Sequence, residues 1–139
     1  MPKIVCFGEV LWDIFPSHKK IGGAPLNVAI RCASLNNEVT MISAIGNDVL
    51  GSKLMDYIIE SNLKSCIQVL DDYKTGEVNV TLNEKGSATY EIEHPRAWDK
   101  ISITESSINA VKASDAFVFG SLIARDETSK NTLYKLIEL

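Results

Sequence analysis

Apolar and polar positions follow two different periods along most of the chain, and each period predicts one kind of element. Short, continuously apolar runs are typical of strands buried in an α/β sheet, and they occupy residues 3–7, 39–45, 67–70 and 116–120. Apolar positions at helical spacing predict helices over residues 25–35, 50–62, 104–111 and 131–139. Because strands and helices alternate, the sequence predicts an α/β fold with a parallel, doubly wound sheet.

The period changes between residues 75 and 96, where apolar and polar residues alternate one by one. Two alternating runs, 78–82 and 88–92, flank the turn-forming sequence Asn83-Glu84-Lys85-Gly86. This pattern predicts a β-hairpin in which each strand has an apolar face and a polar face. The hairpin at 75–96 is expected to be inserted into an α/β core made of residues 1–74 and 97–139.

Composition limits the class of protein. The 139 residues are 45% hydrophobic and 23% charged, which suits one globular domain with its own core. A net charge of −4 without a cluster of Lys or Arg does not favour nucleic acid or an anionic membrane as a partner, and Lys19-Lys20 is interpreted as a solvated loop. Neither a signal-peptide pattern nor an apolar run near the roughly 20 residues of a membrane span is present, so we expect a cytoplasmic protein.

Cysteine, histidine and paired aspartates offer little for metal or redox chemistry. The cysteines are odd in number and widely spaced, which predicts buried free thiols rather than disulfides or a zinc site: Cys6, Cys32 and Cys66. His18 and His94 are distant from each other in sequence, and Asp71-Asp72 is interpreted as a solvated connector. No metal site is predicted.

Gly22 and Gly23 precede the first predicted helix. Adjacent glycines let the backbone take conformations closed to other residues and approach a ligand closely, while Pro25 suits a first helical position. The helix then places Asn27 near its N-terminus, beside the glycines. A Gly-Gly pair alone is as compatible with a plain tight turn as with a ligand site.

Asp13 is the one carboxylate in the apolar segment Val10–Phe15. A charge in such a segment is costly unless it is paired or hydrogen-bonded. From the residues alone, its partner is a backbone amide, a lysine or a ligand.

Longer motifs around these residues resemble a known family. Gly-Gly-Ala-Pro-x-Asn-Val-Ala at 22–29, the helix stop Asn36-Asn37, and Gly-Asn-Asp-x-x-Gly at 46–51 closely resemble the N-terminal signature of the ribokinase-like (PfkB) sugar kinases. Gly-Ala-Pro-x-Asn-Val-Ala and Ala-Trp-Asp at 97–99 look most like the fructokinases. The resemblance implies the N-terminal part of a ribokinase-like doubly wound sheet, with the hairpin as a small β lid.

The same resemblance implies a sugar site. In the family, the aspartate of Gly-Glu-x-x-x-Asp accepts hydrogen bonds from sugar hydroxyls, and residues 8–13 have that spacing. The substrate-binding residues implied are Asp13, Gly22, Gly23, Asn27, Val78 and Val80. Ser121, just after the run at 116–120, is a sugar-contact candidate by position only. Lids of this kind often clasp the lid of a second subunit, so a homodimer through the lid is also implied.

No catalytic residue is predicted in this chain. Family members carry near their C-terminal end an Asp-Thr-x-Gly-Ala-Gly-Asp run that binds the transferring phosphate and supplies the base, and neither this run nor another phosphate-binding loop occurs here. The helix at 131–139 is not followed by the strand that a βαβ unit needs. We therefore expect half of a domain, whose complete enzyme uses ATP and Mg²⁺ and has its base beyond residue 139.

Two hypotheses follow from the sequence. The first is the sugar-binding and lid portion of an ATP-dependent carbohydrate kinase, with fructose as the sugar. The second is a truncated, catalytically inactive sugar-binding or dimerising module. A Rossmann nucleotide-binding domain has the same fold class, but the glycine fingerprint after the first strand is missing.

Overall fold

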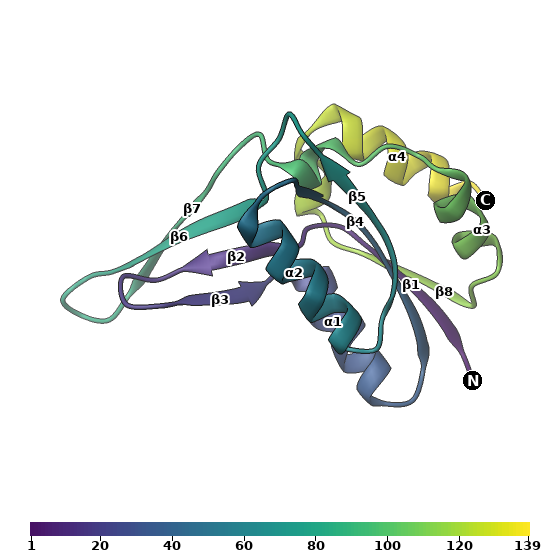
Figure 1. The fold of residues 1–139 in the computed structure, drawn as a ribbon, viewed down its shortest axis with the longest axis horizontal. Helices are drawn as coiled ribbons and strands as arrows, with labels where there is room; N and C mark the ends of the chain where they lie inside the picture. The colour runs from purple at the N-terminus through teal and green to yellow at the C-terminus, as the bar shows by residue number, and fades with distance from the viewer.

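The main sheet runs through the centre of the molecule (Figure 1). The computed structural model describes residues 1–139. The four strands of this sheet pair in the order β5-β4-β1-β8, and every pair is parallel. Their bounds are β1 Lys3–Phe7, β4 Glu38–Gly46, β5 Lys64–Leu70 and β8 Ala116–Phe119. The predicted parallel α/β sheet is confirmed.

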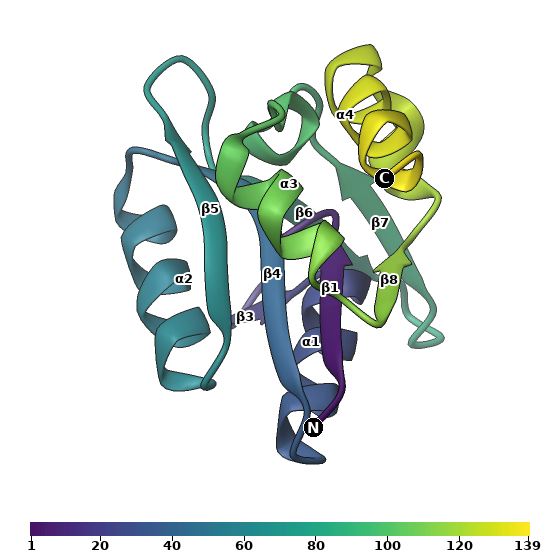
Figure 2. The ribbon, with the colours of Figure 1, turned by 90° about the vertical axis from the view of Figure 1, so that its right-hand side faces the viewer.

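Helices cover both faces of the main sheet (Figure 2). The four α-helices are α1 Ala24–Ser34, α2 Val49–Glu60, α3 Glu105–Lys112 and α4 Glu127–Ile137. One core packs α1 and α2 against one face of the sheet, where Cys6 and Met41 are fully buried. The other core packs α4 and two short 3-10 helices, η1 Ala97–Lys100 and η2 Leu122–Arg125, against Phe7 and Ile42. The sheet is therefore doubly wound, as predicted.

Helix ends follow the local sequence signals. Asn36 adopts a left-handed φ of 65° after α1, and its neighbour Asn37 donates from Nδ2 to the Cys32 carbonyl at 2.9 Å. Asp48 caps α2, because its side chain accepts a hydrogen bond from the Gly51 N–H. The last helix begins at Glu127 rather than 131, because Asp126 caps it by accepting the Thr128 N–H at 3.0 Å. None of these helices is long and apolar enough to cross a membrane.

A second sheet, here called the lid sheet, projects from the helical body (Figure 1). The predicted hairpin is present as β6 and β7, and two further strands join it in the order β3-β2-β6-β7. Their bounds are β2 Leu11–Ile14, β3 Lys19–Gly22, β6 Gly76–Leu82 and β7 Ala88–Ile92. The interpretation of Lys19-Lys20 as a loop was wrong, since both residues belong to β3. A two-stranded hairpin is marginally stable in water, and pairing with β2 and β3 completes a four-stranded sheet.

The strand β8 differs from its prediction as a buried strand. It pairs with β1 on one side only and forms the edge of the main sheet. Ala116 and Phe119 are exposed, and 47% of the Phe119 surface is accessible. An apolar run therefore predicted the strand correctly, but its burial depends on what lies against its free edge.

Candidate functional site

Asp13 and Gly22 meet where the lid sheet leaves the main sheet. The antiparallel pairing of β2 with β3 places Asp13 opposite Lys20 and Leu11 opposite Gly22. The parallel pairing of β2 with β6 places Asp13 opposite Val78. Because directly opposite residues project from the same face of a sheet, these side chains share one face. We call it the Asp13 face.

Both glycines of the turn are required by close contacts. A Cβ atom on Gly22 would overlap Oδ2 of Asp13, so the missing side chain leaves room for that carboxylate. Gly23 has a φ of +110°, and a Cβ atom there would overlap the backbone oxygen of Glu9. The turn therefore brings the start of α1 directly against the connection between β1 and β2.

The Asp13 carboxylate has no hydrogen-bond or ion-pair partner within the chain. Burial raises its pKa above the ordinary value, and the charge of Lys20 across the strand pair acts in the opposite direction. The lysine expected as one alternative partner is thus nearby, but it forms no ion pair. The carboxylate is free to accept hydrogen bonds from another molecule.

Asn27 lies in the first turn of α1, where its backbone N–H donates to the Gly23 carbonyl at 2.9 Å. Its side chain is exposed, whereas the neighbouring Leu26 is fully buried in the core. The structure therefore places Asn27 beside the glycines, as predicted, with its amide accessible.

Val78 and Val80 lie on the Asp13 face, but they are nearly closed to solvent. Their exposed fractions are 5% and 3%, because they pack with Leu11 and Phe15. They form an apolar floor next to the carboxylate rather than an open contact surface. Ser121 is exposed, follows β8 after Gly120, and lies at the N-terminus of η2.

Asp48 has a second role that the sequence did not reveal. Its Oδ1 accepts from the Gly51 N–H at 2.7 Å and from Thr75 Oγ1 at 2.6 Å, and its Oδ2 accepts from the Thr75 N–H at 3.0 Å. Burial acts to raise the pKa of Asp48, but these hydrogen bonds outweigh it and the pKa is lowered. The Gly-Asn-Asp-x-x-Gly motif therefore ties Thr75, the residue before β6, to the start of α2.

The sequence also did not predict a cluster at the root of the lid sheet, by which we mean the place where the lid sheet joins the main sheet. Asp99 is completely buried, and Arg125 binds both of its oxygens. The Arg125 guanidinium lies 4.0 Å from the ring of Trp98, a residue to which the sequence assigned no role. Acidic and basic residues 26 positions apart gave no local signal for this contact.

Glu9 is a buried carboxylate with one unpaired oxygen. The residue is 3% exposed, and its Oε2 accepts no hydrogen bond. Burial raises its pKa, and the charge of Asp99 adds to this, whereas its own backbone N–H and the charge of Arg125 lower it. Removing a solvated charge without replacing its hydrogen bonds is unfavourable, so an ionised Glu9 destabilises the fold.

Glu9→Gln is expected to change the pH dependence of stability. The pKa of Glu9 in the folded protein lies above the ordinary value of 4.5, so the unfolded chain loses this proton at a lower pH. As pH rises from about the ordinary value through the folded pKa, Glu9 therefore lowers the free energy of unfolding. The variant should lose this slope and gain roughly 1–3 kcal/mol above that window. Urea denaturation between about pH 4 and pH 8 measures it, with exposed Glu60→Gln on α2 as control. An identical pH profile in Glu9→Gln would contradict the assignment.

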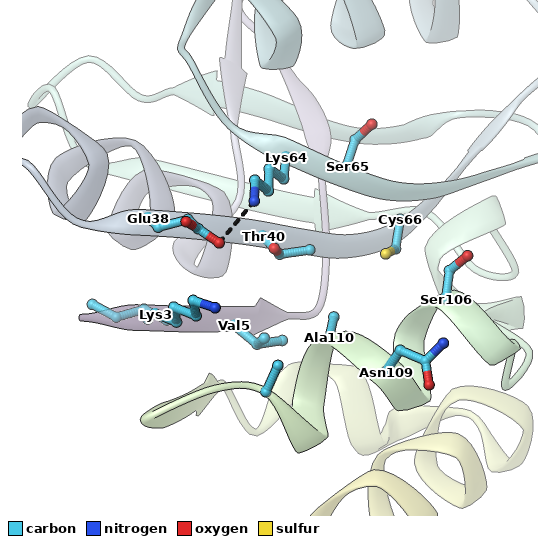
Figure 3. Close-up of a pocket in the computed structure, with 12 residues that line it drawn as sticks. Lys3, Val5, Glu38, Thr40, Lys64, Ser65, Cys66, Ser106, Asn109 and Ala110 are labelled. Carbon is cyan, nitrogen blue, oxygen red and sulfur yellow. Dashed lines mark hydrogen bonds and ion pairs between the residues drawn. The ribbon is translucent and has the colours of Figure 1, made fainter. Parts of the chain in front are cut away.

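A groove of about 440 Å³ is present elsewhere in the molecule, and none of the predicted site residues lines it (Figure 3). It is bordered by the sheet and by α3, and Lys64 Nζ pairs with Glu38 Oε1 at 2.8 Å beside it. Its strand residues come from the N-terminal halves of β1, β4 and β5, whereas ligands of open parallel sheets bind beyond the carboxyl ends of the strands. It is not part of the predicted sugar site.

No group of three or more His, Cys, Asp or Glu side chains is arranged to hold a metal ion. The three cysteines are free, and burial raises the pKa of the Cys6 thiol to about 12. We assign no residue of this chain to Mg²⁺.

Comparison with known proteins places this fold. The profile of the pfkB family of carbohydrate kinases matches residues 1–139. Probable fructokinase-7 of Arabidopsis thaliana is 28% identical over 143 residues, which cover 93% of this chain and 42% of that protein. A sugar kinase of Pyrococcus horikoshii is 30% identical over 129 residues, covering 92% of this chain and 41% of that one. The chain thus spans less than half the length of these relatives.

Crystal structures of related kinases have the same fold as this chain. The crystal structure of the Pyrococcus horikoshii sugar kinase has a TM-score of 0.83 at 27% identity, over 97% of this chain and 50% of that one. The fructokinase of Halothermothrix orenii has a TM-score of 0.87 at 21% identity, over 98% and 52% of the two chains. The doubly wound sheet with its lid sheet is therefore the fold of the ribokinase-like kinases. Together with the match over its whole length, this shows that the chain belongs to the pfkB family of carbohydrate kinases.

Proposed function

We propose that this chain is the sugar-binding and lid portion of an ATP-dependent kinase that phosphorylates a sugar hydroxyl, with fructose as the sugar. The family supports phosphoryl transfer to a carbohydrate, and several relatives carry the name fructokinase. The observation that carries the proposal is the partly buried, unpartnered carboxylate of Asp13 beside the Gly22-Gly23 turn.

The residues of this chain bind and orient the sugar. Asp13 accepts hydrogen bonds from sugar hydroxyls, Gly22 and Gly23 let the backbone approach the ring, and the Asn27 amide adds donors and an acceptor at the start of α1. Val78 and Val80 support the Asp13 face from the side. Holding the hydroxyl in one orientation removes an entropic part of the barrier to phosphoryl transfer.

ATP supplies the transferred phosphoryl group, and a relative from Pyrococcus horikoshii has been crystallised in complex with ATP. Neither a base nor a phosphate-binding run is assigned within residues 1–139. The complete enzyme is proposed to provide both from residues outside this chain, together with the Mg²⁺ that accompanies ATP.

Ligand-induced stabilisation of the natural-length protein tests the sugar. Anything that binds the native state raises its apparent stability by mass action. A thermal-shift series with fructose, ribose, ketodeoxygluconate and adenosine is expected to show the largest rise with fructose. A larger rise in melting temperature with another compound of the series would make that compound the proposed ligand instead of fructose. No rise with any of them would contradict a sugar site.

A second candidate function is dimerisation through the lid sheet. Tyr90 and Ile92 stand opposite Val80 and Val78 and therefore extend the Asp13 face beyond β6. They are 64% and 38% exposed, so an apolar strip of β7 is open to solvent. The same strip fits a second lid in a homodimer, with or without sugar binding.

Tyr90→Ser, alone and combined with Val80→Ser, is expected to halve the mass of a dimer or to weaken sugar binding. The tyrosine contributes apolar area to whatever covers β7, and its loss leaves the hydrogen bonds of the strand intact. Size-exclusion chromatography with light scattering measures mass, and calorimetry measures sugar affinity. Glu91→Ser, on the opposite face of the same strand, is the matched control. Unchanged mass and unchanged sugar affinity in both variants would exclude a role for this face.

A further inference from the structure

Arg125 lies where three separate parts of the chain meet. It is the last residue of η2, which follows β8 and the exposed Ser121. Its Nε donates to Asp99 Oδ1 at 2.7 Å and its Nη2 donates to Asp99 Oδ2 at 2.8 Å. The guanidinium therefore binds the Asp99 carboxylate, which belongs to η1, through two hydrogen bonds. The same Nη2 donates to the Glu93 carbonyl at 2.6 Å, directly after β7.

Contacts of this cluster reach both strands of the hairpin. Arg125 holds the end of β7 through the Glu93 carbonyl and more distantly, at 3.4 Å, through that of Ile92. Trp98, which lies under the guanidinium, fills the space next to Gly76 at the start of β6. A Cβ atom on Gly76 would lie 2.6 Å from this indole, so the fit is close.

The charges make this contact difficult to replace. Asp99 is fully buried and also accepts the Arg96 N–H at 2.8 Å, and the buried carboxylate of Glu9 lies within electrostatic range of both Asp99 and Arg125. One guanidinium thus compensates a region with two buried carboxylates. Its planar fork binds a carboxylate through parallel hydrogen bonds, whereas a lysine ammonium offers a point charge without that geometry.

We propose that Arg125 is a positioning residue for sugar binding: it fixes the root of the lid sheet against the main sheet and so sets where the Asp13 face stands. The inference rests on the proposed sugar site. Asp13 pairs with Val78 through β2 and β6, so a tilt of the hairpin moves the carboxylate together with it. The connection from Ser121 through η2 to Arg125 also joins the loop after β8 to the lid.

Arg125→Lys in the natural-length protein tests this role, because it keeps the charge and removes the fork. Sugar affinity is expected to fall roughly 10- to 100-fold, which corresponds to the loss of one hydrogen bond to a charged group, while the KM for ATP changes little. Hydrogen exchange should become faster at the amides of β6 and β7 and stay unchanged in β4. Arg96→Lys is the matched control, because Arg96 reaches Glu77 and Glu93 only at 3.9 and 3.8 Å.

Each outcome separates this inference from the proposed function. Failure of the unaltered protein to bind any sugar contradicts the sugar site, and the exchange measurement then still decides whether Arg125 fixes the lid root. Normal sugar affinity and unchanged exchange in Arg125→Lys overturn the positioning role, even if the variant is less stable. If Arg125→Lys does not fold, Asp99→Asn is expected to show the same loss of sugar affinity. Unchanged sugar affinity in Asp99→Asn would then overturn the positioning role.

Discussion

Asp13→Ala in the natural-length protein is expected to weaken sugar binding by roughly 2–4 kcal/mol, because a charge-assisted hydrogen bond is lost from a partly buried site. Asn27→Ala should have a smaller effect, since a neutral amide contributes a weaker bond. Isothermal calorimetry measures both affinities. Asp72→Ala, in the connector before β6, is the control for removing an acidic residue that lies outside the site.

The expected result for Asp13 also depends on pH. Burial raises its pKa despite the opposing charge of Lys20, and the ionised carboxylate is the stronger hydrogen-bond acceptor because its two oxygens share the charge. Sugar affinity should therefore decrease as pH falls through this raised pKa, and Asp13→Asn should remove the decrease. A folded Asp13→Ala protein with unchanged sugar affinity would contradict the assignment.

The 139-residue chain alone is expected to show no kinase activity, whereas the same chain extended to the stop codon of its gene should turn over fructose. Phosphoryl transfer depends on positioning the donor and on stabilising charge on the transferred group. In the proposed site, Asp13 and Asn27 orient a sugar hydroxyl, and neither replaces a phosphate-binding helix start or a base. The loss should reach the detection limit.

Release of ADP with fructose and ATP measures this difference. Circular dichroism of the short chain is the necessary control, because Phe119, Ile137 and Leu139 leave an apolar edge exposed beside β8 and α4. Large apolar surfaces of this kind promote association. Sugar-dependent turnover by the folded 139-residue chain would overturn the claim that the catalytic residues lie outside it.

The lid sheet shows where sequence reasoning stopped. The hairpin was predicted from alternation within its own strands and is present as β6 and β7. The strand β3 was missed, because Lys19-Lys20-Ile21-Gly22 has no apolar run and becomes a strand only by pairing with β2. Strand formation in such a segment is decided by its partner, which local periodicity does not contain.

Elements with a strong local pattern were determined by the sequence itself. Apolar runs gave the strands of the main sheet, helical spacing gave the helices, and Asp48 and Thr104 marked two helix starts, because each signal acts within about four residues. The Gly22-Gly23 turn and its neighbour Asn27 were predicted for the same reason. Their family resemblance also came from contiguous motifs.

Only the tertiary structure decided the contacts that hold the lid sheet to the main sheet. Asp48 binds Thr75 across 27 positions and Asp99 binds Arg125 across 26, so neither pair leaves a periodic trace in the sequence. Burial was decided in the same way: Glu9 became enclosed with its Oε2 unpaired, while β8 became an edge strand without a second neighbour. Local sequence specifies the individual helices and strands. Long-range hydrogen bonds and burial depend on which surfaces pack together in the folded chain, and local sequence does not contain that information.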